Sequence, residues 1–237
     1  MKQMLLAAGI AMLLIAPLRA EVREATKNVS GTTVHYKVVL PDGYDPAKTY
    51  PAVLALGGGP QNMNTVDGIL ARFFRAEAEK RGYIVVAPAA PGDDLFFEDG
   101  DRIFPEFLKM MSADYKIRDN KFHIAGPSNG GIASFHLAAA NPDYFLSVTA
   151  FPGYMWEPTL PKLMAISKMC VFAYVGEFDP YMWHGEMRRE VEFLRSKGTH
   201  ASYTVEKGQP HRLDTLAGEH AGRLFDGFEE TAKGCSH

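Results

Sequence analysis

The sequence predicts an α/β protein with a doubly wound, mostly parallel sheet and helices on both faces, built as a single domain without a large lid. Two observations predict it. Short apolar runs typical of strands alternate along the chain with longer segments of helical period, and no repeat, linker or low-complexity segment interrupts the series. Parallel strands need crossovers that lie over the sheet, so this alternation places helices on its two faces.

Seven segments have the composition and spacing of strands. Residues 34–40 alternate between apolar and polar side chains, as a half-exposed strand does, and stop at the turn signal Pro41-Asp42-Gly43. Residues 52–56 and 171–175 are continuous apolar runs, which is typical of strands that are buried on both faces. The remaining predicted strands are 83–87, 122–125, 147–150 and 201–205.

The segments between the strands repeat their apolar residues with helical spacing. In the first of them, this pattern runs from Ile69 to Ala78 and ends at Arg81-Gly82, a common helix terminus. The predicted helices are 69–81, 104–111, 130–140, 186–196 and 213–232. Only 20 residues, 151–170, separate two of the predicted strands, which is too few for a large helical lid.

The composition is that of an average globular domain. Of the 237 residues, 46% are hydrophobic and 22% are charged, which excludes a disordered, collagenous or coiled-coil protein. Lys and Arg number 25 against 28 Asp and Glu, so the formal net charge is −3. Proteins that bind nucleic acid carry clustered positive charge, and this balance therefore argues against nucleic acid as a partner.

The first twenty residues have the pattern of a secretory signal peptide. Lys2 supplies a positive charge, an apolar run follows from Met4 to Ile15, and the small residue Ala20 precedes Glu21. The run is shorter than the roughly 20 apolar residues that span a bilayer, so a membrane anchor is the weaker alternative. We expect cleavage near Ala20, a secreted or periplasmic protein, no stable membrane insertion after cleavage, and a mature domain of residues 21–237.

The two cysteines, Cys170 and Cys235, would then lie in an oxidising compartment. Cys170 precedes a predicted strand and Cys235 follows a helix that runs back toward the same edge of the sheet, so a disulfide between them fits the fold. The chain has no Cys-x-x-Cys motif, and its acidic residues between Asp93 and Asp101 lack the spacing of a calcium loop. We therefore expect no metal and no cofactor.

The most specific motif in the chain is Gly126-Pro127-Ser128-Asn129-Gly130, between the predicted strand 122–125 and the predicted helix 130–140. It matches Gly-x-Ser-x-Gly, in which a sharp turn from strand to helix lifts the serine hydroxyl out of the sheet. Ser128 is therefore the predicted nucleophile. The alternative is a phosphate-binding loop, but the chain lacks the Gly-Lys-Ser/Thr sequence of such a loop.

A serine hydroxyl becomes a good nucleophile when a base takes its proton, and a carboxylate orients that base. In such a sheet the chain order is serine, acid, histidine, and the groups lie on loops at the carboxyl ends of strands. Asp179 follows the strand 171–175 and His211 follows the strand 201–205. We predict Ser128, Asp179 and His211 as a catalytic triad. The alternatives on these and nearby loops are the acid Glu177 and the bases His184 and His220.

Acyl transfer passes through an oxyanion that needs two preorganised N–H donors. The backbone N–H of Asn129, directly after the nucleophile, is one predicted donor. Gly57-Gly58-Gly59 follows the strand 52–56 at the same edge of the sheet, and Gly58 is the other predicted donor, with Gly59 as its alternative. These glycines could instead serve only to turn the chain.

Together these motifs resemble an α/β-hydrolase over about residues 33–232. The short loops and the export signal are similar to the group of feruloyl esterases, acetylxylan esterases and polyhydroxybutyrate depolymerases. The resemblance implies a serine esterase with Ser128, Asp179 and His211 as its triad. It implies a small-molecule or polymer-attached ester as substrate.

Aromatic residues on loops at the same edge are candidate substrate-binding residues, because aromatic side chains suit an acyl group with a flat or apolar face. They are Tyr154, Trp156, Tyr181 and Trp183. The sequence thus predicts an exported hydrolase that cleaves carboxylic esters through an acyl-enzyme. Two alternatives stay open: a serine peptidase or peptide amidase with the same triad, and a non-catalytic protein that binds a ligand in the cleft.

Overall fold

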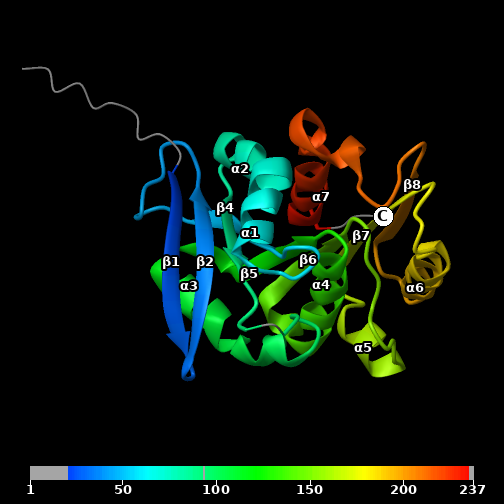
Figure 1. The fold of residues 1–237 in the computed structure, drawn as a ribbon, viewed down its shortest axis with the longest axis horizontal. Coiled ribbons are helices and arrows are strands. Elements are labelled where there is room, and N and C mark those ends of the chain that lie inside the picture. Colours follow the sequence, from blue (N-terminus) through cyan, green and yellow to red (C-terminus); the bar gives the residue numbers. More distant parts are fainter. Residues whose placement is uncertain (1–20, 93, 235–237) are drawn as a thin grey trace, which may run out of the picture.

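The computed structural model describes residues 21–92 and 94–234, which form one eight-stranded sheet with helices on both faces (Figure 1). The spatial order of the strands is β1-β2-β4-β3-β5-β6-β7-β8. The strands are β1 (Glu21–Val29), β2 (Thr32–Leu40), β3 (Tyr50–Ala55), β4 (Ile84–Pro88), β5 (Ile117–Gly126), β6 (Phe145–Ala150), β7 (Cys170–Gly176) and β8 (Ala201–Glu206).

The sheet is mostly parallel, as predicted. Strands β4, β3, β5, β6, β7 and β8 pair in parallel, while β2 is antiparallel to both β1 and β4. Every predicted strand overlaps an observed one. Strand β1 was not predicted, because it lies at the edge of the sheet and its residues are mostly exposed or half-buried. Such a strand carries little apolar patterning.

The helices are α1 (Met63–Ile69), α2 (Arg75–Arg81), α3 (Glu106–Asp114), α4 (Asn129–Ala140), α5 (Leu160–Ala165), α6 (His184–Ser196) and α7 (Gly222–Ala232). The predicted helix 213–232 is wrong in its first part, where two short 3₁₀ turns precede α7. Gly218 has φ +58° there, a left-handed conformation that an α-helix cannot contain. A π-helical turn, Leu70–Phe74, joins α1 to α2 and was also not predicted.

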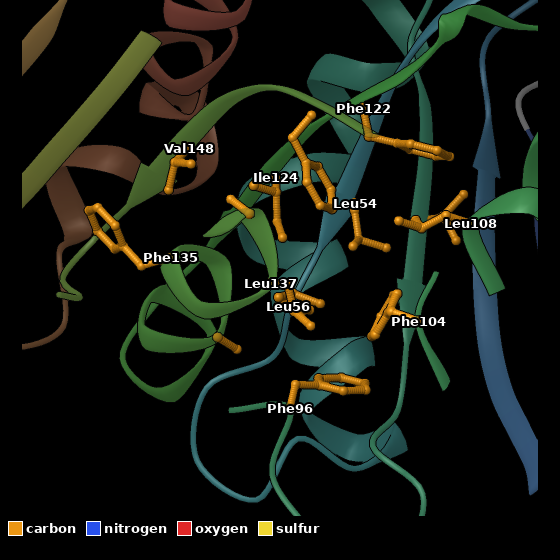
Figure 2. Packing of buried hydrophobic residues seen from close by; sticks show 14 of the residues in the cluster. Leu54, Leu56, Phe96, Phe104, Leu108, Phe122, Ile124, Phe135, Leu137 and Val148 are labelled. Carbon is orange, nitrogen blue, oxygen red and sulfur yellow. The ribbon is translucent and has the colours of Figure 1, made fainter. Parts of the chain in front are cut away.

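Two apolar clusters hold the layers together. On one face, α3, α4 and α6 pack on the sheet through residues such as Leu108, Leu137 and Val191. Figure 2 shows Leu54 of β3 and Ile124 of β5 in the same cluster. On the other face, α1, α2 and α7 cover the sheet (Figure 1). Burying a large apolar side chain contributes about 1.5–3 kcal/mol, so these two clusters fix the sheet and the loops that leave it.

Three expectations concern the ends of the chain. The predicted signal peptide, residues 1–20, lies outside the described residues. Cys170 is buried at the start of β7 and is not a free cysteine, but its predicted partner Cys235 also lies outside the described residues, so that pairing stays a prediction. Within the described ranges, no helix is long and apolar enough to cross a membrane.

Candidate active site

Ser128 lies at a sharp turn between β5 and α4. Its backbone has φ +56° and ψ −123°, a strained conformation for a residue with a side chain. The glycines on either side allow the turn, because the carbonyl oxygen of Leu56 passes close by. An added Cβ would lie 2.5 Å from this oxygen at Gly126 and 2.3 Å from it at Gly130. Only glycine fits at these two positions, so the motif sets the position of the serine hydroxyl.

His211 joins Ser128 to Asp179 by two hydrogen bonds. Its Nε2 lies 2.9 Å from Ser128 Oγ, and its Nδ1 lies 2.7 Å from Asp179 Oδ2. The Asp179 side chain is fully buried, and its Oδ1 accepts the backbone N–H of Tyr181 at 2.8 Å. A buried carboxylate with partners for both oxygens holds the imidazole in one orientation. We call these three residues the Ser128 relay.

The loops that carry Asp179 and His211 are held against each other by close backbone contact. An added Cβ at Gly176, the last residue of β7, would lie 2.0 Å from the carbonyl oxygen of Pro210. The N–H of Phe178 donates to the carbonyl oxygen of Gln209 at 2.8 Å. The glycine after the apolar run of β7 therefore allows the acid and the histidine to approach each other.

The alternative acid and bases lie elsewhere. Glu177 accepts the backbone N–H of Gly208 with Oε2 at 2.8 Å, whereas the Nδ1 of His211 bonds to Asp179. His184 is 3.1 Å from the hydroxyl of Tyr203 through its Nδ1. His220 is exposed beside Glu219. The structure therefore brings together the three residues that the sequence favoured.

Both residues predicted as oxyanion donors lie next to Ser128. Asn129 is the first residue of α4, where backbone N–H groups have no acceptor within the helix. Gly58 lies against the turn, because an added Cβ there would be 3.5 Å from Ser128 Cβ and 3.0 Å from the carbonyl oxygen of Pro127. The Asn129 side chain donates to the carbonyl oxygen of Gly59 at 2.9 Å, which ties the glycine loop to α4.

The four aromatic candidates divide into two groups. Tyr181 and Trp183 each stand edge-on to the ring of His211, with ring centroids 4.6 and 4.9 Å away, and Tyr154 packs on Trp183 at 5.1 Å. Trp156 instead packs on Phe97, at 6.1 Å, and is half exposed. Three of the four therefore form one aromatic cluster beside the relay, whereas Trp156 makes no ring contact with that cluster.

A cavity of about 480 Å³ is lined by both Ser128 and His211, and none of the four aromatic candidates lines it. We call it the Arg72 pocket, and its remaining walls include Ile69, Arg72, Phe73, Phe151, Arg212 and Leu213. The sequence pattern does not predict these residues as pocket walls. Ile69 and Phe73 fitted the apolar face of a predicted helix, and nothing in the pattern distinguishes a core residue from a pocket wall. Among the described residues, no cluster of three or more metal-binding side chains is present.

The profile of the "Putative esterase" family matches residues 101–221, a little more than half of the chain. The chain belongs to this esterase family. The matched segment contains all three residues of the Ser128 relay. It also includes strands β5 to β8, whose ends carry them.

Solved structures similar to this esterase-family chain have the α/β-hydrolase fold, which confirms the predicted fold class. The feruloyl esterase module of Clostridium thermocellum, solved with sinapinate, aligns with a TM-score of 0.69 and 17% identity, covering 81% of this chain and 82% of that one. The S-formylglutathione hydrolase of Agrobacterium tumefaciens aligns with a TM-score of 0.65 and 18% identity, over 92% of this chain and 99% of that one.

Curated relatives of the chain include larger proteins. Dipeptidyl-peptidase 5 of Porphyromonas gingivalis is 28% identical over 151 residues, which cover 59% of this chain and 22% of that protein. The match therefore spans about a fifth of the length of that relative. Taken together, the family and these matches support a hydrolase.

Proposed function

We propose that the chain is a serine-dependent hydrolase of carboxylic esters. The observation that carries the proposal is the Ser128 relay, in which the base is within 2.9 Å of the nucleophile and within 2.7 Å of a buried carboxylate. This geometry is the one that activates a serine for attack on an acyl group. The strained turn and the open pocket at Ser128 support it, because a serine with only a structural role needs neither.

In the proposed reaction, Ser128 Oγ attacks the ester carbonyl carbon while His211 Nε2 takes the hydroxyl proton. The backbone N–H groups of Asn129 and Gly58 hold the oxyanion of the tetrahedral intermediate. His211 then gives its proton to the departing alcohol, which leaves an acyl group on Ser128. Water attacks this acyl-enzyme and gives its proton to His211. The second tetrahedral intermediate then collapses, which breaks the bond between the acyl carbon and Ser128 Oγ, releases the carboxylic acid and returns the proton from His211 to Ser128. Asp179 keeps the imidazole oriented and stabilises its charged form throughout. No step requires a metal or a cofactor.

A peptidase or peptide amidase is the second candidate, and the match to dipeptidyl-peptidase 5 favours it. The same relay cleaves amides when the histidine protonates the leaving amine. The third candidate is a protein that only binds a ligand beside Ser128. This candidate gives the complete Ser128 relay no role. We also infer that residues 1–20 direct export and are removed, which a mature N-terminus at Glu21 would support.

The test is a comparison of kcat/KM on a panel of aryl esters, acetylated sugars, hydroxybutyrate oligomers and dipeptide anilides. We expect at least one ester to be cleaved faster than any peptide, and Ser128→Ala to remove that activity. Faster cleavage of a peptide than of every ester would favour the peptidase. Equal turnover by the wild type and Ser128→Ala would exclude Ser128 as the nucleophile of either enzyme. No turnover of any ester or peptide by the folded wild type would leave the binding protein.

A further inference from the structure

The Arg72 pocket has apolar walls and two guanidinium groups. Ile69, Phe73, Phe151 and Leu213 supply apolar surface, Arg72 and Arg212 supply positive charge, and no acidic residue lines the cavity. Its volume of about 480 Å³ lies within the usual range of about 300–1,000 Å³ for small-molecule sites. The aromatic cluster that contacts His211 contributes no residue to the lining of this cavity and contains no charged side chain. The pocket and the aromatic cluster therefore suit chemically different groups.

The π-helical turn between α1 and α2 supplies Arg72 and Phe73 to the pocket. In this turn the N–H of Arg75 bonds to the carbonyl oxygen of Leu70, one residue further along than in an α-helix. Such turns often occur at functional sites. Phe73 packs edge-on against Phe151 with ring centroids 5.0 Å apart, and the guanidinium of Arg72 lies over the Phe73 ring at 5.1 Å. The arginine is thus held in place by the apolar wall.

The hydrogen-bonding capacity of Arg72 is incompletely used. One terminal nitrogen pairs with the carboxylate of Asp214, whose side chain is 76% exposed. Nε is buried and has no hydrogen-bond partner. Buried polar groups are nearly always paired in native structures, and an exposed ion pair contributes little because water screens it. Arg72 can therefore bind an anion in the pocket at low cost, either in place of Asp214 or together with it.

Arg212 adds a second guanidinium. It directly follows His211, it is exposed, and it has no ion-pair partner within the described part of the chain. Two arginines facing one apolar cavity next to a nucleophile match the planar, bidentate hydrogen bonding of a carboxylate. We propose that the Arg72 pocket binds a carboxylate-bearing part of the substrate, so that the favoured substrates are esters of acidic molecules. This inference rests on the proposed function and specifies its substrate class.

The test compares matched pairs of esters that differ in one negative charge. On the acyl side the pair is para-nitrophenyl hydrogen glutarate and para-nitrophenyl pentanoate, and on the alcohol side it is para-acetoxybenzoate and its methyl ester. We expect the wild type to favour the charged ester in one pair. That ratio of kcat/KM values should fall about tenfold in Arg72→Gln and in Arg212→Gln, since each removes a charge-assisted hydrogen bond.

Two further variants distinguish an effect of the positive charge in the pocket from an effect on the fold. Arg72→Lys keeps the positive charge and should retain part of the preference. Arg75→Gln removes an exposed arginine of α2 that pairs with Glu79 away from the pocket, and it should keep the wild-type ratio. Arg212 is exposed, so its replacement tests the proposal even if Arg72→Gln fails to fold. Equal rates on both members of each pair, or wild-type ratios in both glutamine variants, would overturn the proposal.

The experiments distinguish a wrong carboxylate-site proposal from a wrong esterase proposal. Cleavage of the neutral esters with no charge preference would leave the esterase standing without the carboxylate site. If no ester is cleaved, equilibrium dialysis of Ser128→Ala with para-nitrophenyl hydrogen glutarate still tests the pocket. Binding that weakens about tenfold on adding Arg72→Gln would then support the carboxylate site alone, and binding that does not change would overturn it.

Discussion

Glu190 of α6 accepts the backbone N–H of Met155 with both carboxylate oxygens, at N···O distances of 3.1 and 3.0 Å. Met155 lies between Tyr154 and Trp156, so this carboxylate fixes the loop that brings Tyr154 to the aromatic cluster. Glu190 is buried, and burial raises its pKa from 4.5 to about 8. The nearby charge of Glu186 acts in the same direction, whereas the Met155 N–H and Arg189 lower the pKa.

This raised pKa predicts a loss of stability with rising pH. Between about pH 4.5 and pH 8 the folded protein holds a proton on Glu190 that the unfolded chain has lost, so the free energy of unfolding falls as pH rises through this window. Glu190→Gln removes that titration. The free energy of unfolding of the variant minus that of the wild type, measured by urea unfolding, should therefore increase by on the order of a few kcal/mol from pH 5 to pH 9.

The matched control is Glu192→Gln, an exposed position on the same helix. Its stability should follow that of the wild type at every pH. Parallel pH profiles for Glu190→Gln and the wild type would contradict the predicted burial effect.

The environment of His123 predicts that the protein loses stability as the pH falls, the opposite of the effect of Glu190. It is buried, its Nδ1 lies 2.7 Å from Ser147 Oγ, and its ring stacks on Phe228 at 4.8 Å. Burial, with a smaller effect of Arg118, lowers its pKa from 6.5 to about 3. The unfolded chain therefore binds a proton that the folded protein does not, and the free energy of unfolding falls as pH drops from 6.5 toward 3.

His123→Leu should flatten that acid dependence in urea unfolding. At pH 7 it should cost about 1–3 kcal/mol, because Ser147 loses its buried partner. Adding Ser147→Ala should recover part of this cost, since replacing both partners leaves no unsatisfied group. An acid dependence as steep as that of the wild type would show that another group is responsible.

Asp179→Asn tests the acid of the relay. The amide can donate to Nδ1 of His211, which would place the proton on Nε2 and prevent it from accepting the proton of Ser128. We expect kcat for an ester to fall roughly 10³–10⁴-fold with little change in melting temperature. Glu177→Gln, at the alternative acid, should keep wild-type kcat. A larger loss in Glu177→Gln than in Asp179→Asn would reverse the assignment.

Replacing Trp183 should affect catalysis less than replacing Asp179. Its ring stands edge-on to the His211 ring, and such pairs contribute about 0.5–1.5 kcal/mol beyond burial. Trp183→Ala should therefore lower kcat/KM for esters about two- to tenfold. Trp156→Ala, at the residue that packs on Phe97, should change kcat/KM less. The reverse order would place the substrate over Trp156.

The parts of the site that the sequence predicts are those with strict steric or chemical requirements. Gly126 and Gly130 flank Ser128 because the Leu56 carbonyl oxygen leaves no room for a side chain. Such a requirement leaves a motif in the sequence. The buried strands are equally recognisable, because continuous apolar runs such as 171–175 reflect burial on both faces.

Features that depend on tertiary contacts left no such pattern. The side chain of Arg72 lies in the pocket wall because a π-helical turn interrupts an otherwise regular helical period. Strand β1 pairs through its backbone along the sheet edge while its side chains are mostly polar. Loop position alone makes all four aromatic residues equal candidates, and only the folded structure separates Tyr181 and Trp183, beside His211, from Trp156.

Covalent labelling with a fluorophosphonate, followed by peptide mass spectrometry to locate the adduct, tests most directly whether Ser128 is an activated nucleophile. We expect the wild type to form one adduct, on Ser128. Ser128→Ala should form none, and Asp179→Asn should form it much more slowly. No adduct on the folded wild type, or an adduct on a residue other than Ser128, would contradict the central claim that His211 and Asp179 activate this serine.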